Sequence, residues 1–270
     1  MKVLLMLAAG VFVTATATAQ VTEGKMIYER KMNAHRNLPP EAEQFKAMVP
    51  EFNTTKMELA FKGQQSLYKP FQTDEDDLPV TDQGGGGMRM RFGGAASGEI
   101  FKDYEKDTKT EIRELGPKKY LLDDSLKHYV WKLAKDTMTV AGHLCHKATT
   151  TIKAGALQGM GRMRFGRGTD TAAATPPADQ QVVAWYADDI ASPSGPDDFG
   201  GLPGLILLVD VEDGLLVYSP IGFDTKAGTV KAPSNGKKIS RDEYKALAEP
   251  QTGNIRRGGP GGGSFIIRGN

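Results

Sequence analysis

The chain has 270 residues, of which 34 are Lys or Arg and 33 are Asp or Glu, so its formal net charge at neutral pH is +1. This balance excludes the strongly basic composition of proteins whose main partner is nucleic acid. Cys145 is the single cysteine, which excludes an intramolecular disulfide, so a packed core must stabilise the fold.

Residues 1–19 have the pattern of a secretory signal peptide. An apolar run follows Lys2, and Ala17 and Ala19 form an A-x-A cleavage motif directly before Gln20. The run is too short to cross a bilayer, no later segment reaches ~18 consecutive apolar residues, and no cysteine follows the motif to carry a lipid. We therefore predict an exported protein, periplasmic or at the cell surface, with no transmembrane segment in its mature form.

Several segments alternate between apolar and polar residues, which is typical of strands with one buried face. The clearest is 54–62, where Met57, Leu59 and Phe61 share one face. Weaker patterns of the same kind occur at 24–32, 99–105, 108–115, 129–135, 146–153 and 181–187. They predict a mainly β protein: one domain over residues 20–250, built as a single curved antiparallel sheet or half-barrel.

Two short helices complete the predicted fold. Residues 39–48 begin with proline and continue with good helix formers. Residues 240–249 begin with Ser240 and Glu243, which have the spacing of a capping box, and Pro250 is expected to end this helix.

Glycine-rich segments near 81–98 and 155–179, and a Gly/Arg-rich tail at 251–270, predict mobile insertions and a flexible tail. Both insertions contain the pentamer RMRFG and adjoining methionines, whose thioethers suit Cu(I). Neighbouring arginines place like charge beside any bound cation, which favours basic loops that contact an anionic surface or partner. The candidate copper ligands are Met88, Met90, Met160 and Met163.

The other candidate metal ligands are His143, Cys145 and His146. On a strand, His143 and Cys145 share a face and His146 points away, so at most two of them reach one ion. We interpret Cys145 as a buried thiol and expect neither a metal site nor a cofactor. The acidic clusters at 74–77, 188–189 and 197–198 lack the spacing of a calcium loop and are interpreted as solvated surface. No nucleophile elbow, zinc-protease, Walker or dinucleotide motif is present, so we expect no enzyme activity.

The sharpest local pattern is GGLPGLILLVDVEDG, residues 200–214. Pro203 fixes the first central position of a bend, and Gly204 is predicted to supply the positive φ of a type II turn. The apolar run that follows predicts a strand covered on both faces, and Asp213-Gly214 predicts a hairpin. No helix follows that could hold an anion. The motif is therefore interpreted as a structural corner formed by Gly201, Leu202, Pro203, Gly204, Leu205 and Ile206.

These residues also carry a resemblance. The segment 184–210 resembles the signature of the GLPGLI family of exported proteins found in Bacteroidota, and 131–150 resembles that family's upstream block, with its Cys-x-Lys-Ala element at 145–148. The resemblance implies an exported β protein, and it implies no activity.

The leading hypothesis is a non-enzymatic carrier or accessory protein of the cell envelope, whose concave sheet face holds an apolar or peptide-like ligand. Two alternatives remain open. The first is envelope copper handling through the Met-Arg insertions, and the second is an interaction module for an outer-membrane transporter. Neither the ligand nor the oligomeric state can be derived from the sequence.

Overall fold

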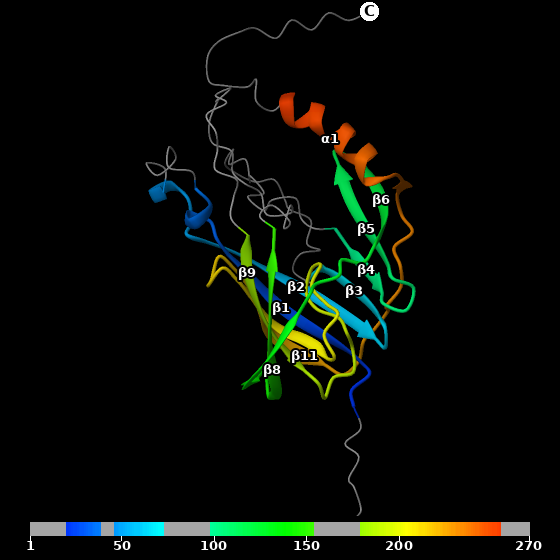
Figure 1. Cartoon of the computed structure of the whole chain (residues 1–270). Coiled ribbons are helices and arrows are strands. Elements are labelled where there is room, and N and C mark those ends of the chain that lie inside the picture. The colour runs from blue at the N-terminus through cyan, green and yellow to red at the C-terminus, as the bar shows by residue number, and fades with distance from the viewer. Residues whose placement is uncertain (1–19, 39–45, 73–97, 154–178, 255–270) are drawn as a thin grey trace, which may run out of the picture.

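The computed structural model describes residues 20–38, 46–72, 98–153 and 179–254 (Figure 1). In these residues twelve strands form one sheet, in the order β12-β6-β5-β4-β3-β2-β1-β11-β10-β9-β8-β7. The elements are β1 (Glu23–Asn33), η1 (His35–Asn37), β2 (Phe52–Lys62), β3 (Gln65–Pro70), β4 (Ile100–Asp103), β5 (Thr108–Leu115), β6 (Lys118–Ser125), β7 (Lys132–Val140), β8 (His143–Ile152), β9 (Gln180–Ala187), β10 (Leu205–Val211), β11 (Leu216–Asp224), β12 (Lys237–Lys238) and α1 (Arg241–Asn254). The prediction of a mainly β chain is confirmed.

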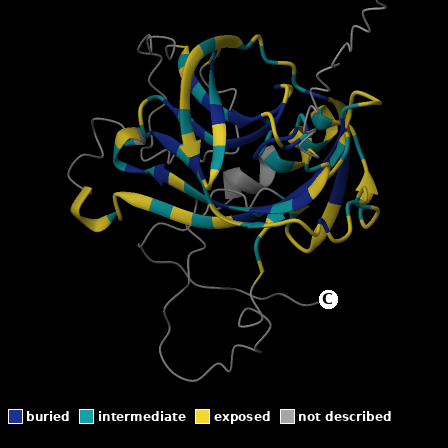
Figure 2. Cartoon of the chain, turned by 90° about the horizontal axis from the view of Figure 1, so that it is seen from below, coloured by how far each residue is buried: buried dark blue, intermediate teal, exposed yellow. Residues whose placement is uncertain are grey.

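The sheet is strongly curved and open (Figures 1 and 2). Its edge strands, β12 and β7, lie at opposite ends of the strand order. All neighbouring strands are antiparallel except β12 and β6, which are parallel. The prediction of a purely antiparallel sheet is therefore wrong at this edge, because the chain returns from β11 through a long connection and runs beside β6 in the same direction.

The core lies on the inner face of the curved sheet. Met26 and Tyr28 of β1 and Leu59 and Phe61 of β2 have no exposed surface (Figure 2). Along β1 less buried residues alternate with the buried ones, which is the period-2 pattern expected for a strand with one face in the core. In β2 the small side chain of Ala60, between Leu59 and Phe61, is buried as well. Burying each such side chain stabilises the fold by roughly 1.5 to 3 kcal/mol.

The connection between β9 and β10, residues 188–204, contributes to the same core. Its side chains Ile190, Phe199 and Leu202 are at most 3% exposed. Trp131 Nε1 donates a hydrogen bond to the carbonyl oxygen of Gly200 at 2.9 Å, and the Tyr28 hydroxyl donates to the carbonyl oxygen of Ile206 at 2.5 Å. We call this segment the 188–204 connection.

The corner that ends the 188–204 connection differs from its predicted geometry. Gly201 has a φ of 82°, whereas Gly204 is not in the left-handed region. A Cβ on Gly204 would lie 1.9 Å from the carbonyl oxygen of Ala187, so close backbone approach requires this glycine. The type II turn prediction is wrong, whereas the prediction of a buried strand is confirmed by Leu205 and Ile206, which have no exposed surface.

The predicted hairpin between β10 and β11 is confirmed. The two strands are antiparallel and pair Val211 with Leu216 next to the turn. Glu212, Asp213 and Gly214 have φ values of 51°, 48° and 88°, so three successive residues adopt the left-handed conformation. Glycine and aspartate tolerate this conformation better than most residues do.

The C-terminal helix α1 begins as predicted. The Glu243 N–H donates to Ser240 Oγ at 3.2 Å and the Ser240 N–H donates to Glu243 Oε2 at 2.8 Å, which is a capping box. The prediction that Pro250 ends the helix is wrong, because α1 continues to Asn254.

The other predicted helix, at 39–48, lies outside the described residues as far as 45, and residues 46–48 form a 3₁₀ turn. The signal peptide, the methionine-bearing parts of both insertions and the end of the tail also lie outside them. Among the residues that the structure describes, no helix is long and apolar enough to span a membrane.

Candidate functional site

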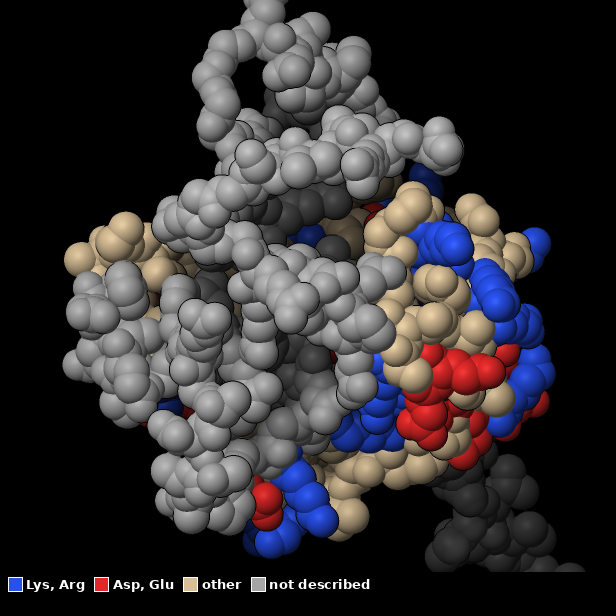
Figure 3. Space-filling model, turned by 90° about the horizontal axis from the view of Figure 1, so that it is seen from above, with Lys and Arg blue, Asp and Glu red and all other residues tan. Residues whose placement is uncertain are grey.

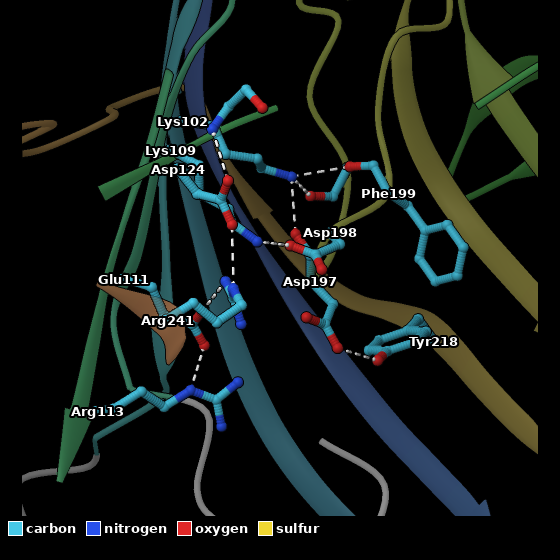
Figure 4. Close-up of polar contacts among 12 residues, drawn as sticks. Lys102, Lys109, Glu111, Arg113, Asp124, Asp197, Asp198, Phe199, Tyr218 and Arg241 are labelled. Carbon is cyan, nitrogen blue, oxygen red and sulfur yellow. Dashed lines mark hydrogen bonds and ion pairs between the residues drawn. The ribbon is translucent and has the colours of Figure 1, made fainter. Parts of the chain in front are cut away.

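A group of polar side chains is enclosed between the inner face of the sheet and the 188–204 connection (Figure 4). The register of β4 and β5 places Lys102 opposite Lys109. Two like charges on one face of a sheet destabilise it unless acceptors or counter-charges are near. The acceptors and the counter-charge come from the 188–204 connection. We call the group the polar cluster: Arg30, Lys102, Lys109, Asp197, Asp198 and Tyr218.

Lys102 fixes the 188–204 connection to the sheet. Its ammonium donates hydrogen bonds to the carbonyl oxygens of Gly195, Asp197 and Phe199, at 2.9, 2.8 and 2.8 Å. An ammonium has three donors, so all are used. Burial lowers the pKa of Lys102 to about 8, although the charges of Asp198 and Asp197 oppose the shift. Because its donors are saturated, Lys102 is a structural residue.

Asp198 is the counter-charge of Lys109. The Lys109 Nζ and Asp198 Oδ1 atoms are 2.8 Å apart, with the side chains 7% and 26% exposed. Burial acts to raise the pKa of Asp198, but the charge and hydrogen bond of Lys109 outweigh it and hold that pKa below its usual value. Asp198 is therefore an ionised acceptor at the edge of the cluster.

Asp197 is in a different environment from its neighbour. Its φ is 52°, and its Oδ2 atom accepts a hydrogen bond from the Tyr218 hydroxyl at 2.9 Å. Burial raises the pKa of Asp197, and the charge of Asp198 adds to the shift, while Arg30 and Lys102 oppose it. Arg30 is itself hydrogen-bonded to Tyr218 and lies in the field of Asp197.

The two carboxyl groups therefore have pKa values moved in opposite directions. Such divergence is how acid and base pairs are recognised in enzymes. Each group already accepts a hydrogen bond with one of its two oxygen atoms, Asp198 Oδ1 from Lys109 and Asp197 Oδ2 from Tyr218. The second oxygen of each carboxyl can accept from a bound polar group.

Three tyrosine hydroxyls near the polar cluster lack a partner. The hydroxyls of Tyr68, Tyr104 and Tyr129 are buried and make no hydrogen bond in the part of the chain that the structure describes. An unsatisfied buried hydroxyl costs roughly 1 to 3 kcal/mol. The Tyr129 ring stacks on Phe199 with centroids 5.3 Å apart and contacts Trp131 at 5.6 Å. Tyr129 and Trp131 are half-buried, so they form an aromatic rim beside the cluster.

A second ionic group attaches α1 to the sheet. Glu111 of β5 lies between two arginines: Arg113 Nε is 2.5 Å from its Oε1 atom and Arg241 Nη2 is 3.3 Å from its Oε2 atom (Figure 4). Arg241 also contacts Asp124 at 3.0 Å. Since the Glu111 side chain is buried, this group holds the start of α1 in place.

The acidic pair at 197–198, which the sequence pattern assigns to solvated surface, is enclosed in the polar cluster instead. The reason is the 188–204 connection, which brings these residues to β4 and β5, almost a hundred positions earlier in the chain. Lys102 and Lys109 carry no recognisable motif in the sequence. The local sequence pattern that points to this region is the corner at Gly201 to Ile206, which lies at the end of the same connection.

The candidate metal ligands of β8 each contact a different aspartate or remain buried. His143 Nδ1 is 2.7 Å from Asp189 Oδ2, and His146 Nε2 is 3.4 Å from Asp188 Oδ2. Among the described residues no group of three potential ligands is close enough to hold a metal ion. The four candidate methionines lie outside the described residues.

Cys145 is buried, and its thiol donates to the carbonyl oxygen of His143 at 3.6 Å. Burial raises the pKa of this thiol to about 11, and Asp189 and Asp188 add to the shift. The thiolate is the reactive form. At pH 8 we expect a thiol reagent to label native protein at least about a hundredfold more slowly than guanidinium-unfolded protein. Equal rates in the two states would contradict burial of the thiol.

The described surface seen in Figure 3 carries acidic and basic side chains next to one another around α1 and the adjoining strands. Two pairs on this part of the molecule are Lys238 with Asp123, at 3.1 Å, and Lys119 with Glu114, at 3.3 Å. Interspersed charges of this kind produce no strong field of one sign.

Known structures resemble this fold at low sequence identity. The chain is similar to two solved structures of PNGF-II, in space groups P21 and C2, with TM-scores of 0.53 and 0.52 and identities of 11% and 12%. The similarity covers 84% of this chain and 33% and 32% of those chains, so the protein spans about a third of their length. At this identity the likeness concerns the fold alone.

No curated relative matches the sequence. One family model does match, and the matched stretch begins at the rim residue Trp131 and ends inside β10. Residues 131–208 of the chain match the model of a family described as "Protein of unknown function (Porph_ging)".

Proposed function

We propose that the protein is an exported, non-enzymatic carrier or accessory protein of the cell envelope that binds a peptide-like ligand at the polar cluster. The observation that carries the proposal is the combination of charged groups of both signs, three unpartnered tyrosine hydroxyls and an aromatic rim in one place. Arg30, Asp197 and Asp198 keep part of their surface exposed. Peptides present amides, charges and apolar side chains together, which such a mixed surface complements.

The protein's own apolar side chains already fill part of the inner face of the sheet, which favours a polar ligand over an apolar one. Ile190, Phe199 and Leu202 of the 188–204 connection pack there against the strands and are almost fully buried. An apolar ligand would have to displace these side chains, at roughly 1.5 to 3 kcal/mol each. A polar ligand at the cluster would instead satisfy groups that lack partners.

The sequence supports export. The pattern of residues 1–19 and the resemblance to the GLPGLI family of Bacteroidota both favour a periplasmic or surface location. We expect the mature chain to begin at Gln20, so an intact-mass measurement on protein secreted by its own host should show residues 1–19 removed. A further loss of ammonia would show that Gln20 has cyclised. Retention of residues 1–19 would contradict the export proposal.

Native mass spectrometry of protein purified from its host tests the binding proposal. We expect a co-purifying mass that is released on denaturation, and we expect Asp197→Asn to weaken its binding about tenfold or more, because the amide has one acceptor oxygen where the carboxyl has two. Asparagine tolerates the left-handed backbone of this position, so the fold is kept.

Glu58→Gln is the matched control, because Glu58 pairs with Lys25 and Lys69 and is not part of the polar cluster. This variant should retain the ligand. Wild-type protein that carries no ligand, or equal loss in the two variants, would contradict the proposal.

A further inference from the structure

The polar cluster carries more positive than negative charge. Its cations are Arg30, Lys102 and Lys109, and its carboxyl groups are Asp197 and Asp198. The charges that act most strongly on Lys102 and on both aspartates come from these same residues and from Lys127. The Lys127 ammonium lies 5.2 Å from the centre of the Tyr129 ring, so it adds positive charge on the side of the aromatic rim.

The ionic group at α1 shows that this imbalance is particular to the polar cluster. Around Glu111, two carboxylates face two arginines, so that group is balanced. In the polar cluster three cations share two carboxyl groups, and burial raises the pKa of Asp197, so one of these negative charges is weakly held. An excess of buried charge is costly unless a partner of opposite sign compensates it. The pattern fits a site whose remaining counter-charge belongs to a ligand.

The groups beside the cations that lack partners can donate hydrogen bonds. Tyr68 has no exposed surface and its hydroxyl makes no hydrogen bond in the described part of the chain. Burial raises its pKa, and the nearby charge of Arg30 opposes the shift. Arg30 itself donates a hydrogen bond to Tyr218, its neighbour across β1 and β11, although a guanidinium has five N–H donors. An ionised carboxylate only accepts, so it complements these donors and the positive charge together.

We propose that the ligand presents a carboxylate to Arg30 and to the tyrosine hydroxyls beside it. This inference rests on the peptide-binding function proposed above and adds the charge of the bound group. Contacts between a guanidinium and a carboxylate are charge-assisted and among the strongest hydrogen bonds in proteins. The free oxygens of Asp197 and Asp198 accept N–H groups of the same peptide. A peptide offers a carboxylate either at its C-terminus or on an acidic side chain, and the two sources can be tested separately.

An NMR titration of the full chain at pH 7 tests the proposal. The protein has two tryptophans, so it gives two indole signals. Trp131 reports on the rim of the polar cluster, and Trp185 of β9, which pairs with Lys147 outside the cluster, is the internal reference. The signal of Trp131 should shift on binding, and that of Trp185 should not.

Four acetylated tripeptides are the probes. Acetyl-Ala-Ala-Glu amide has only a side-chain carboxylate, acetyl-Ala-Ala-Gln has only a C-terminal one, acetyl-Ala-Ala-Gln amide has none, and acetyl-Ala-Ala-Lys amide carries a positive charge. We expect one or both carboxylate peptides to bind with a Kd at least about tenfold lower than that of the neutral amide. Comparison of the first two peptides shows which source of carboxylate is used. The lysine peptide should bind no better than the neutral amide.

Two variants locate the carboxylate. Arg30→Gln should weaken binding of the carboxylate peptide about tenfold and remove its advantage over the neutral amide. Tyr129→Phe keeps the ring and deletes only an unpartnered hydroxyl, so the fold should be no less stable while carboxylate binding falls about threefold. Tyr244→Phe is the matched control, because the Tyr244 hydroxyl donates to the carbonyl oxygen of Glu114 at 3.1 Å, near α1 and outside the polar cluster. This variant should bind as the wild type does.

The outcomes separate this inference from the function on which it rests. If the neutral and lysine peptides move the Trp131 signal with the same affinity as the carboxylate peptides, the carboxylate inference is overturned and peptide binding is retained. If none of the four peptides moves that signal, both are overturned. A preference for carboxylate that survives unchanged in both Arg30→Gln and Tyr129→Phe would also overturn the assignment.

Discussion

Replacing Lys102 by methionine is expected to lower the free energy of unfolding by about 3 to 5 kcal/mol, the range seen when one partner of a buried charged interaction is removed. Methionine fills a similar volume but leaves the carbonyl groups of Gly195, Asp197 and Phe199 without their donor. Urea denaturation of the wild type and the variant measures the difference. The result would show that one side chain fixes the 188–204 connection to β4.

Lys69→Met is the matched control, because the Lys69 side chain is 38% exposed and its ion pair with Glu58 is 3.7 Å long. We expect a change of at most about 1 kcal/mol. A change in Lys102→Met as small as this would contradict the structural role of Lys102.

Lys102 also links stability to pH. Its pKa is lowered from 10.5 to about 8 in the folded protein, so between these values the unfolded chain binds the proton that the folded chain has released. The contribution of this group to stability therefore increases with pH over that window, by at most about 1.4 kcal/mol per pH unit. Below pH 8 both states are protonated and the contribution is constant. Lys102→Met should lack this increase.

Gly204→Ala is expected to destabilise the fold by roughly 3 kcal/mol or more, at the upper end of what overpacking costs. The new Cβ would lie 1.9 Å from the Ala187 carbonyl oxygen and 2.6 Å from its carbon, and both atoms belong to the paired end of β9. Because backbone cannot turn aside as a flexible side chain can, β9 and β10 must separate. Thermal denaturation followed by circular dichroism measures the loss.

Gly201→Ala separates the two reasons for which glycine occurs in this motif: a left-handed backbone at Gly201 and close backbone approach at Gly204. At Gly201 nothing lies within 4 Å of a Cβ, and the φ of 82° is the only constraint. The expected cost is about 1 to 2 kcal/mol, from left-handed backbone strain alone. Equal costs at the two positions, or a larger cost at Gly201, would contradict the close-approach explanation for Gly204.

Strands could be predicted wherever one face is apolar and the other polar. The segments 24–32, 54–62 and 108–115 match β1, β2 and β5 closely for this reason. β7 was displaced, predicted at 129–135 and found at Lys132–Val140, because it is an edge strand with only Val140 buried and has no apolar face to define its bounds. β3 and β6 were missed because they are short or have polar ends.

The polar cluster could not be derived from the sequence, because its members come from β1, β4, β5, β11 and the 188–204 connection. No local spacing relates Lys102 to Gly195 or Lys109 to Asp198. Composition rules place acidic pairs on the surface, and they fail where a long connection folds back onto a sheet. The capping box of α1 was predictable because both of its residues lie within one turn of helix.

The position of β1 governs the order in which the chain can fold. β1 lies in the middle of the sheet, yet one of its two neighbours is β11, which begins at Leu216, near the other end of the sequence. Contacts this distant require closure of a very long loop and slow the folding of a domain. A nascent chain that lacks β11 has a full partner for only one edge of β1. The centre of the sheet can therefore assemble only after nearly the whole polypeptide has been made available.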